Sequence, residues 1–199
     1  MKPIKNWNDV QAATERQQLP VGGYLVKIMD AEVKTYSGRD GGAFEKLEIS
    51  IDITDGEHKG YYAQDYRNQT NEDKKWRGVL RVYVPKDDGS KEDEWTKSTF
   101  KALTEAVEDS NNGYHWDWNE SSLKGKVVGC LFRSEEWEFD GRSGWATRPF
   151  KFVSVDVIKE NKFRIPKEKP LKKKTSIDVT VDEPQTDFTE ITDNDDLPF

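Results

Sequence analysis

The sequence has very little of what metal sites and thiol or histidine catalysis use. Its 199 residues include one cysteine, Cys130, and two histidines, His58 and His115. A single cysteine excludes an intrachain disulfide and a zinc cluster built on several thiolates. Neither histidine lies beside a recognisable nucleophile motif, and the glycines within 38–42 lack the Lys-Ser/Thr pair of a phosphate-binding P-loop. We therefore expect a protein that is not an enzyme and that uses no metal or other cofactor.

Long apolar runs are also missing. Hydrophobic residues make up 34% of the chain and charged residues 35%, which exceeds the roughly 25% charged residues of an ordinary soluble domain. No run approaches the roughly 18 apolar residues of a membrane-spanning helix. Residues 1–7 lack the apolar stretch of a secretory signal. We therefore expect a cytoplasmic protein.

Charge is distributed unevenly along the chain. Lys and Arg number 31 and Asp and Glu number 38, for a formal net charge of −7. Residues 159–174 hold eight bases and two acids, residues 175–199 hold eight acids and no base, and residues 1–158 keep a net charge of −5. Prolines interrupt any periodicity from residue 159 onward, and few aromatics are present there to form a core. The sequence predicts a domain over 1–158, a basic linker over 159–174 and a disordered acidic tail over 175–199.

Strand patterns dominate residues 1–158. Leu47, Ile49, Ile51 and Ile53 alternate with polar residues, and this period of two gives a strand one buried and one solvated face. Further strands are predicted at 24–33, 60–68, 126–137 and 145–158, a helix at 95–109, hairpin loops at 35–43 and 139–144, and an irregular insertion at 71–94 around a β-like piece at 79–84.

Three strands, a helix and two strands follow one another in the order of the OB-fold. The sequence thus predicts a mainly β protein, a five-stranded Greek-key OB-fold barrel with a helix between the third and fourth strands, plus a disordered C-terminal tail. A β-sandwich that pairs the same strands differently is the alternative. In an OB-fold, strands 2 and 3 together with the 1–2 and 4–5 loops form the oligonucleotide-binding surface.

Aromatic residues beside lysine or arginine are the candidates for binding single-stranded nucleic acid. Such a site combines cations that bind the phosphates with flat rings on which the nucleobases stack. Trp76 lies between two cations and is expected to be exposed, and Arg81 is expected to share a strand face with Tyr83. The candidates are Tyr36, Arg39, Tyr62, Tyr66, Arg67, Lys75, Trp76, Arg77, Arg81, Phe139, Arg142, Trp145 and Arg148. Glu48 and Asp52, on the outward face of the second strand, would repel phosphates and count against this interpretation.

Two groups of residues resemble known families. The acidic, hydrophobic C-terminus resembles the tip of bacterial single-stranded-DNA-binding proteins, and its matching residues are Asp193, Asp195, Asp196, Leu197, Pro198 and Phe199. The predicted domain over 1–158, called the head below, is similar to phage-encoded proteins of replication and recombination. The residues that carry this similarity are Pro20, Gly22, Gly23 and Tyr24, then Gly41 and Gly42, then Lys59, Gly60 and Tyr61. Leu197 stands where the bacterial family usually has isoleucine, and the insertion at 71–94 departs from the compact phage pattern.

The resemblance implies a phage-type single-stranded-DNA-binding protein that acts in replication, recombination or repair. It also implies that the C-terminal tip recruits partner proteins of these processes. The oligomeric state stays open, with a homodimer as one option. Two alternatives remain on the sequence alone: an adaptor on an OB scaffold with little affinity for DNA, and a nuclease or annealing enzyme.

Overall fold

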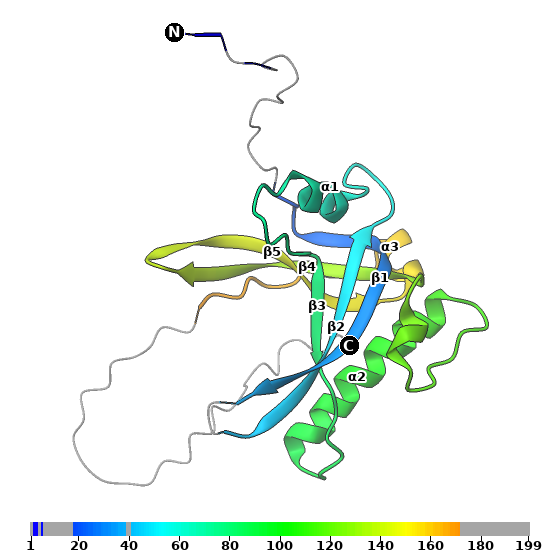
Figure 1. Ribbon diagram of the computed structural model, residues 1–199. Helices are drawn as coiled ribbons and strands as arrows, with labels where there is room; N and C mark the ends of the chain where they lie inside the picture. The colour runs from blue at the N-terminus through cyan, green and yellow to red at the C-terminus, as the bar shows by residue number, and fades with distance from the viewer. Residues whose placement is uncertain (1, 4, 6–17, 39–40, 172–199) are drawn as a thin grey trace.

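A computed structural model describes residues 2–3, 5, 18–38 and 41–171 (Figure 1). Its centre is a five-stranded antiparallel sheet with the strand order β3-β2-β1-β4-β5. The elements are β1 (Gly22–Ser37), β2 (Ala43–Ile53), α1 (Tyr61–Asn68), β3 (Val79–Tyr83), α2 (Lys91–Ser110), the 3-10 helix η2 (Glu120–Leu123), β4 (Val127–Phe139), β5 (Arg142–Val153) and α3 (Val155–Lys159). The mainly β class predicted from the sequence is confirmed, but the sheet is open rather than a closed barrel.

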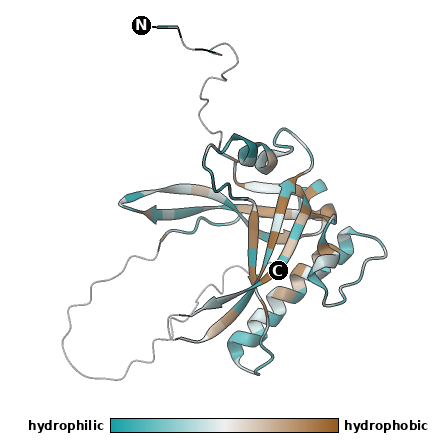
Figure 2. Ribbon diagram, in the orientation of Figure 1, coloured by the Kyte–Doolittle hydropathy of each residue, from teal (hydrophilic) through white to brown (hydrophobic). Residues whose placement is uncertain are grey.

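The core lies on one face of this sheet. Leu47, Ile49, Ile51 and Ile53 are all buried, so the predicted alternation in β2 is confirmed. The same core takes Val26 and Ile28 from β1, Val128, Cys130 and Phe132 from β4, and Phe100, Leu103 and Val107 from α2. Figure 2 shows the hydrophobic residues gathered along the centre of the sheet, while the outer parts of the β4–β5 hairpin are more polar.

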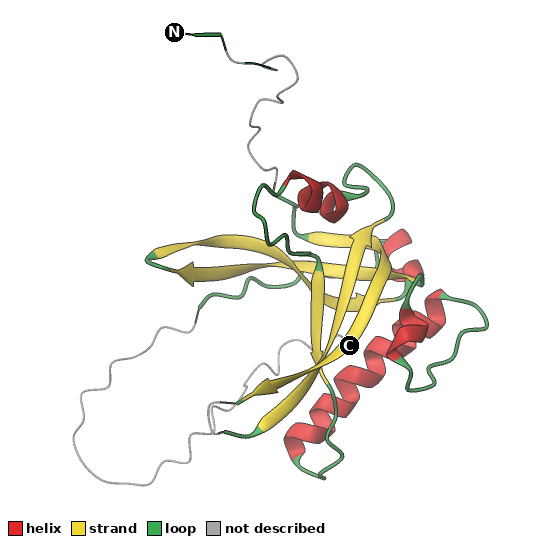
Figure 3. Ribbon diagram, in the orientation of Figure 1, coloured by secondary structure: helices red, strands yellow, loops and turns green. Residues whose placement is uncertain are grey.

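The third predicted strand is wrong. Within the stretch 60–68, residues 61–68 form a helix, α1, which Figure 3 shows beside the sheet. Gly60 has a φ of 73°, a left-handed conformation that glycine adopts without strain, and it turns the chain out of the extended state before the helix. The carboxylate of Asp52 then accepts hydrogen bonds from the Tyr62 and Ala63 backbone amides at 2.9 and 3.3 Å. This cap from the preceding strand, β2, satisfies amides that a helix N-terminus leaves unpaired, and it outweighs the strand preference of tyrosine.

The third strand is instead the β-like piece that the sequence placed inside an insertion. β3 pairs with β2 in antiparallel fashion, with Arg81 opposite Glu48 and Tyr83 opposite Lys46. The helix predicted at 95–109 is confirmed and begins a turn earlier, because the Ser90 hydroxyl accepts a hydrogen bond from the Asp93 amide at 3.1 Å.

The last part of the described chain is packed, so the loss of structure expected from residue 159 does not begin there. β5 ends at Val153, earlier than predicted, and α3 follows it. Residues 160–171, called the C-terminal strap below, then run beside β4, where Lys169 exchanges backbone hydrogen bonds of 2.9 Å with Ser134 and Glu136. The acidic tail lies outside the described residues.

Two glycines allow α3 and the strap to lie directly on the sheet. A Cβ atom on Gly23 would be 2.8 Å from the ring of Phe163, and one on Gly129 would be 2.9 Å from the carbonyl oxygens of Val153 and Ser154. The Gly-Gly-Tyr sequence that opens β1 thus has a packing role. Nowhere in the described residues is there a helix long and apolar enough to cross a membrane.

Candidate nucleic-acid interface

Three aromatic rings and a lysine gather on the outer face of β1, β2 and β3, the face turned away from the core. Tyr36 stacks on Phe44 with ring centroids 5.6 Å apart and planes 12° apart, and Phe44 lies 5.5 Å from the ring of Tyr83. Lys46 Nζ is 4.5 Å from the centroid of Tyr83, 5.4 Å from that of Phe44 and 5.6 Å from that of Tyr36. These four residues, called the β1–β3 cluster, place one cation among rings from three strands, and Tyr83 is 47% exposed.

Glu48, which the sequence predicts to repel phosphates, has its negative charge balanced by cations beside this cluster. Its carboxylate accepts hydrogen bonds from the Tyr36 hydroxyl and from Arg81 Nε, both at 2.5 Å, and lies 3.1 Å from Lys34 Nζ. Partial burial alone would raise the pKa of Glu48, but the hydrogen bonds from Tyr36, Arg81 and Lys34 prevail and lower the pKa to about 2. Glu48 therefore stays ionised and holds two cations at the surface of the sheet.

Asp52 does not face solvent either. It is buried, and its oxygens accept hydrogen bonds from the backbone amides of Ile53, Tyr62 and Ala63. Its charge thus serves the N-terminus of α1, where the helix dipole favours an anion. The objection that Glu48 and Asp52 would repel phosphates from the outer face no longer holds for either residue.

The β4–β5 hairpin presents a second group on its outer face. Its two-residue turn is Asp140-Gly141, both with positive φ, which is typical of a tight hairpin turn. The register pairs Phe139 with Arg142. Phe139 is 78% exposed, and no ion pair within the described part of the chain involves Arg142. The loop predicted at 139–144 is thus a shorter turn, but it does present Phe139 and Arg142 at the hairpin tip.

Further along the hairpin the same face carries Trp137 and a pair of arginines. Trp137 lies across Gly144, where a Cβ atom would be 3.2 Å from the indole. Arg133 and Arg148 are directly opposite each other, a like-charge pairing that costs stability in a sheet. Arg133 Nε pairs with Glu135 Oε1 at 3.0 Å, which offsets the repulsion, whereas Arg148 is exposed. Trp137, Phe139, Arg142 and Arg148 form the hairpin cluster.

Trp145 does not belong to this cluster. Side chains alternate between the two faces of a strand, and Trp145 is an odd number of residues from both Arg142 and Arg148. It is 42% exposed on the opposite face of the hairpin. Trp145 therefore lies on a different face from Arg142 and Arg148, its neighbours in the sequence, and Trp137 from the partner strand shares their face instead.

Trp76 is not the exposed residue that its charged neighbours indicated. It is partly buried against the core, and its indole nitrogen donates a hydrogen bond of 3.0 Å to the carbonyl oxygen of Ile51. Lys75 pairs with Asp73 at 3.3 Å, and Arg77 pairs with Asp65 at the same distance. The cations beside Trp76 are thus both engaged, Lys75 by a carboxylate of its own loop and Arg77 by a carboxylate of α1.

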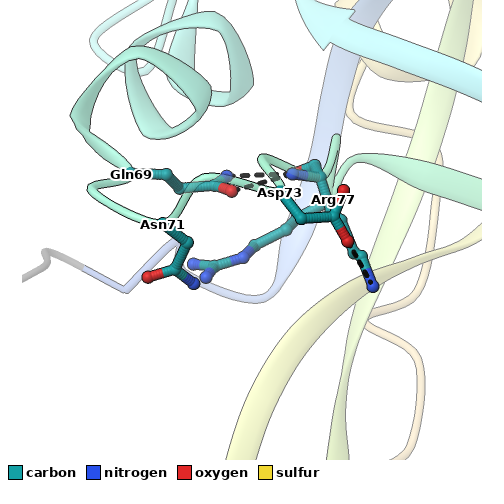
Figure 4. Close-up of a pocket in the computed structure, with 5 residues that line it drawn as sticks. Gln69, Asn71, Asp73 and Arg77 are labelled. Atoms are coloured by element: carbon teal, nitrogen blue, oxygen red, sulfur yellow. Dashed lines mark hydrogen bonds and ion pairs between the residues drawn. The ribbon is translucent and has the colours of Figure 1, made fainter.

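A small polar cavity of about 290 Å³ opens in this loop, between α1 and β3. Figure 4 shows the amide of Gln69 bridging to the backbone of Lys75, and the guanidinium of Arg77 extending toward Asn71. These internal hydrogen bonds fix the shape of the loop. The site offers polar groups but no aromatic platform.

Three more predicted residues lie on α1, because the strand that was to carry them does not exist. Tyr62 is only 3% exposed and packs against Phe132, so it cannot contact a ligand. Tyr66 leans on Trp76, with ring centroids 5.9 Å apart, and Arg67 Nε donates to the backbone of its own helix. None of the three lies on the outer face of the sheet. Arg39 and the tip residues 193–199 lie outside the described residues.

Of the predicted residues, the structure thus places Tyr36 in the β1–β3 cluster and Arg81 beside it. Phe139, Arg142 and Arg148 belong to the hairpin cluster. Prediction missed Phe44, Lys46 and Trp137 as members of these clusters. The alternation that identified the core face of β2 also assigns Phe44 and Lys46 to the other face, so a signal for these two was present. Trp137 needed the register of the hairpin. When the chain is compared with models of known protein families and with curated proteins, nothing matches.

Proposed function

We propose that this chain binds single-stranded DNA without catalysing a reaction on it, and that the outer face of the sheet is the binding surface. The observation that carries the proposal is the β1–β3 cluster, in which Tyr36, Phe44 and Tyr83 surround Lys46. Unstacked bases need aromatic faces and phosphates need cations, and a site that offers both binds single strands with little dependence on sequence.

The topology supports this surface as an OB-fold binding face. The strand order β3-β2-β1-β4-β5, with α2 between β3 and β4, is the order of an OB barrel, and β3 contacts β5 without forming a ladder. We interpret the sheet as an OB-fold whose barrel stays open between β3 and β5. The β1–β3 cluster and the hairpin cluster then occupy the strand 2–3 face and the 4–5 hairpin that bind oligonucleotides in this fold.

A titration of the protein with oligo-dT tests the proposal, and variants on the two faces of one hairpin sharpen it. Each stacked base is worth about 1–3 kcal/mol, so Tyr83→Ala and Phe139→Ala should each weaken binding roughly 5- to 150-fold. Trp145→Ala is the matched control, because it removes an exposed aromatic from the opposite face of the same hairpin, and it should leave affinity within about twofold.

The titration and the variants can each support or contradict binding at the outer face of the sheet. Saturable binding that weakens with salt, by about 0.7 in log K per log salt for each phosphate neutralised, agrees with the proposal. Equal losses for Phe139→Ala and Trp145→Ala would place the DNA elsewhere. No oligo-dT binding, together with intact capture of protein partners, would favour an adaptor instead, and metal-dependent shortening of the oligonucleotide would favour a nuclease.

The same proposal includes recruitment of replication or recombination proteins by the tip, through Asp193, Asp195, Asp196, Leu197, Pro198 and Phe199. An apolar ring close to several carboxylates suits a small pocket with a basic rim. Deletion of Phe199 alone removes no side-chain charge. It should abolish partner binding and leave oligo-dT affinity unchanged.

The acidic tail is also expected to compete with DNA. Leu171 donates a backbone hydrogen bond of 2.9 Å to Glu136, so the chain beyond it starts beside β4. Tethering can give an effective concentration in the millimolar range. Truncation after residue 174 removes a net −8 and should tighten oligo-dT binding, most at low salt. Truncation after Leu171 removes three lysines as well and should tighten binding less. Unchanged affinity of both truncations at every salt concentration would refute the competition.

A further inference from the structure

We propose that the connection between α2 and β4 is a docking surface for an arginine-rich segment of a partner protein, centred on Trp118. This surface is separate from the outer face of the sheet. Trp118 is 75% exposed, the most exposed of the tryptophans that the structure describes. One face of its indole stacks on Phe100, with centroids 6.2 Å apart and planes 8° apart, and Trp116 lies 6.2 Å away.

The indole of Trp118 is held in place rather than free to fold down onto the core. Its backbone has a φ of 63°, a left-handed conformation that is strained for a bulky residue. Asp117 accepts a hydrogen bond from the Asn119 amide at 3.1 Å, and Asn119 accepts one from the Ser121 amide at 3.1 Å, so the turn is closed on both sides. The Trp116 amide donates to Glu108 at 2.7 Å, which ties the turn to α2. An exposed aromatic in a fixed geometry loses little freedom when a ligand binds it.

The chain around Trp118 is acidic apart from His115, whose Nδ1 lies 3.8 Å from a carboxylate oxygen of Glu108. Residues 102–123 contain five acids, Glu105, Glu108, Asp109, Asp117 and Glu120, and no lysine or arginine. The flanking cations are engaged already. Lys101 pairs with Glu105 at 3.6 Å, Lys124 pairs with Asp30 at 3.2 Å, and Lys126 lies 4.5 Å from the ring of Tyr114.

This combination selects arginine among possible ligands. The planar guanidinium stacks on an indole face and binds a carboxylate with two parallel hydrogen bonds, which an ammonium group cannot do. DNA is excluded by the same charges, because five carboxylates repel phosphates. In a segment with several arginines, one guanidinium can stack on the exposed indole while others bind the carboxylates of Asp117 and Glu120.

Indole NMR signals of the full-length protein test the proposal directly. The probe is a synthetic peptide of six arginines spaced by glycines, and its lysine counterpart is the comparison. The acidic tail also attracts such peptides, but only binding at this surface moves the Trp118 indole signal. We expect a saturable shift of that signal, no shift of Trp95, which is exposed on the first turns of α2, and an affinity at least threefold lower for the lysine peptide.

Charge variants complete the test without removing the ring. Asp117→Asn combined with Glu120→Gln should lower the affinity for the arginine peptide, measured from the Trp118 signal, at least fivefold. It should leave oligo-dT affinity unchanged. An unmoved Trp118 signal, or equal affinity for the arginine and lysine peptides, would overturn the proposal. A Trp118 shift that follows protein concentration without any peptide would also overturn it, because the occupant would then be a second copy of this chain.

Discussion

Glu48→Gln is the substitution that probes the outer face of the sheet most directly. It keeps the shape of the side chain and removes the charge that binds Lys34 at 3.1 Å and Arg81 and the Tyr36 hydroxyl at 2.5 Å each. Two consequences follow, one for the pH dependence of stability and one for DNA binding.

The first consequence has a defined sign and size. The pKa of Glu48 is lowered from 4.5 to about 2, so the ionised carboxylate stabilises the folded state above pH 4.5, and this contribution is lost as the pH falls toward 2. A difference of this size corresponds to about 3 kcal/mol, at 1.36 kcal/mol per pKa unit. Between pH 5 and pH 2 the wild-type protein should therefore lose about 3 kcal/mol more free energy of unfolding than Glu48→Gln, in urea titrations followed by tryptophan fluorescence.

The second consequence concerns the two released cations. Once Glu48 is neutral, Lys34 and Arg81 can both bind phosphates, so oligo-dT affinity should rise at low salt. The slope of log K against log salt should steepen by at most about 1.4, which is about 0.7 for each cation. The reasoning fails if the variant shows the pH dependence of the wild-type protein, because Glu48 would then not be paired in solution. An altered pH dependence with an unchanged salt slope would instead place the DNA away from these cations.

Two further substitutions and one labelling experiment test the packing. Trp76→Ala should lower the free energy of unfolding by about 3 kcal/mol and leave oligo-dT affinity unchanged, since Trp76 packs on the core and donates a hydrogen bond to Ile51. Weaker DNA binding with unchanged stability would show instead that Trp76 belongs to the interface. Gly129→Ala should cost about 1–3 kcal/mol in thermal unfolding, because its Cβ would meet backbone carbonyl oxygens at 2.9 Å, and an unchanged Tm would contradict this. Burial raises the pKa of the Cys130 thiol, so it should react with alkylating agents only on unfolding, and rapid labelling of the native protein would show that the core opens.

Periodicity carried most of the fold that could be predicted. The alternation from Leu47 to Ile53 identified β2 and its buried face, and the helical spacing of Phe100, Leu103 and Val107 identified α2. Both signals are local and are imposed by the core itself, so they survive whatever surrounds them. The closure of the barrel depends on how β3 meets β5, and no local pattern encodes that.

The error at residues 60–68 has a non-local cause. Three tyrosines in this stretch favour a strand, and the helix becomes the better choice only because Asp52 supplies a carboxylate at its N-terminus. The misplacement of Trp76 has a similar origin. Its neighbours Lys75 and Arg77 pair with Asp73 of the loop and Asp65 of α1, so their charges do not draw the indole into solvent.

In the candidate interface, the length of the turn between β4 and β5 determines which residues of the hairpin can be predicted to share a face. A loop over 139–144 leaves the faces of the flanking strands unassigned, whereas the two-residue turn Asp140-Gly141 fixes the register. A shift by one residue would move every side chain to the other face. This is why Trp145 was grouped with the arginines, and why Trp137, which lies across Gly144 from the partner strand, was missed.

The net charge of the head raises an objection to DNA binding, and the arrangement of the charges answers it. Residues 1–158 hold 28 acids and 23 bases, and five of the acids lie within residues 102–123, which contain no base. The remainder of the head is therefore balanced, with 23 charges of each sign. On its outer face, Lys46 and Arg142 lie beside aromatic rings, and Glu48 is enclosed by Lys34 and Arg81. The acidic excess belongs to the second half of α2 and to the connection after it that carries Trp118. The charge that would weaken a DNA-binding surface is thus the charge that a second, cation-binding surface requires.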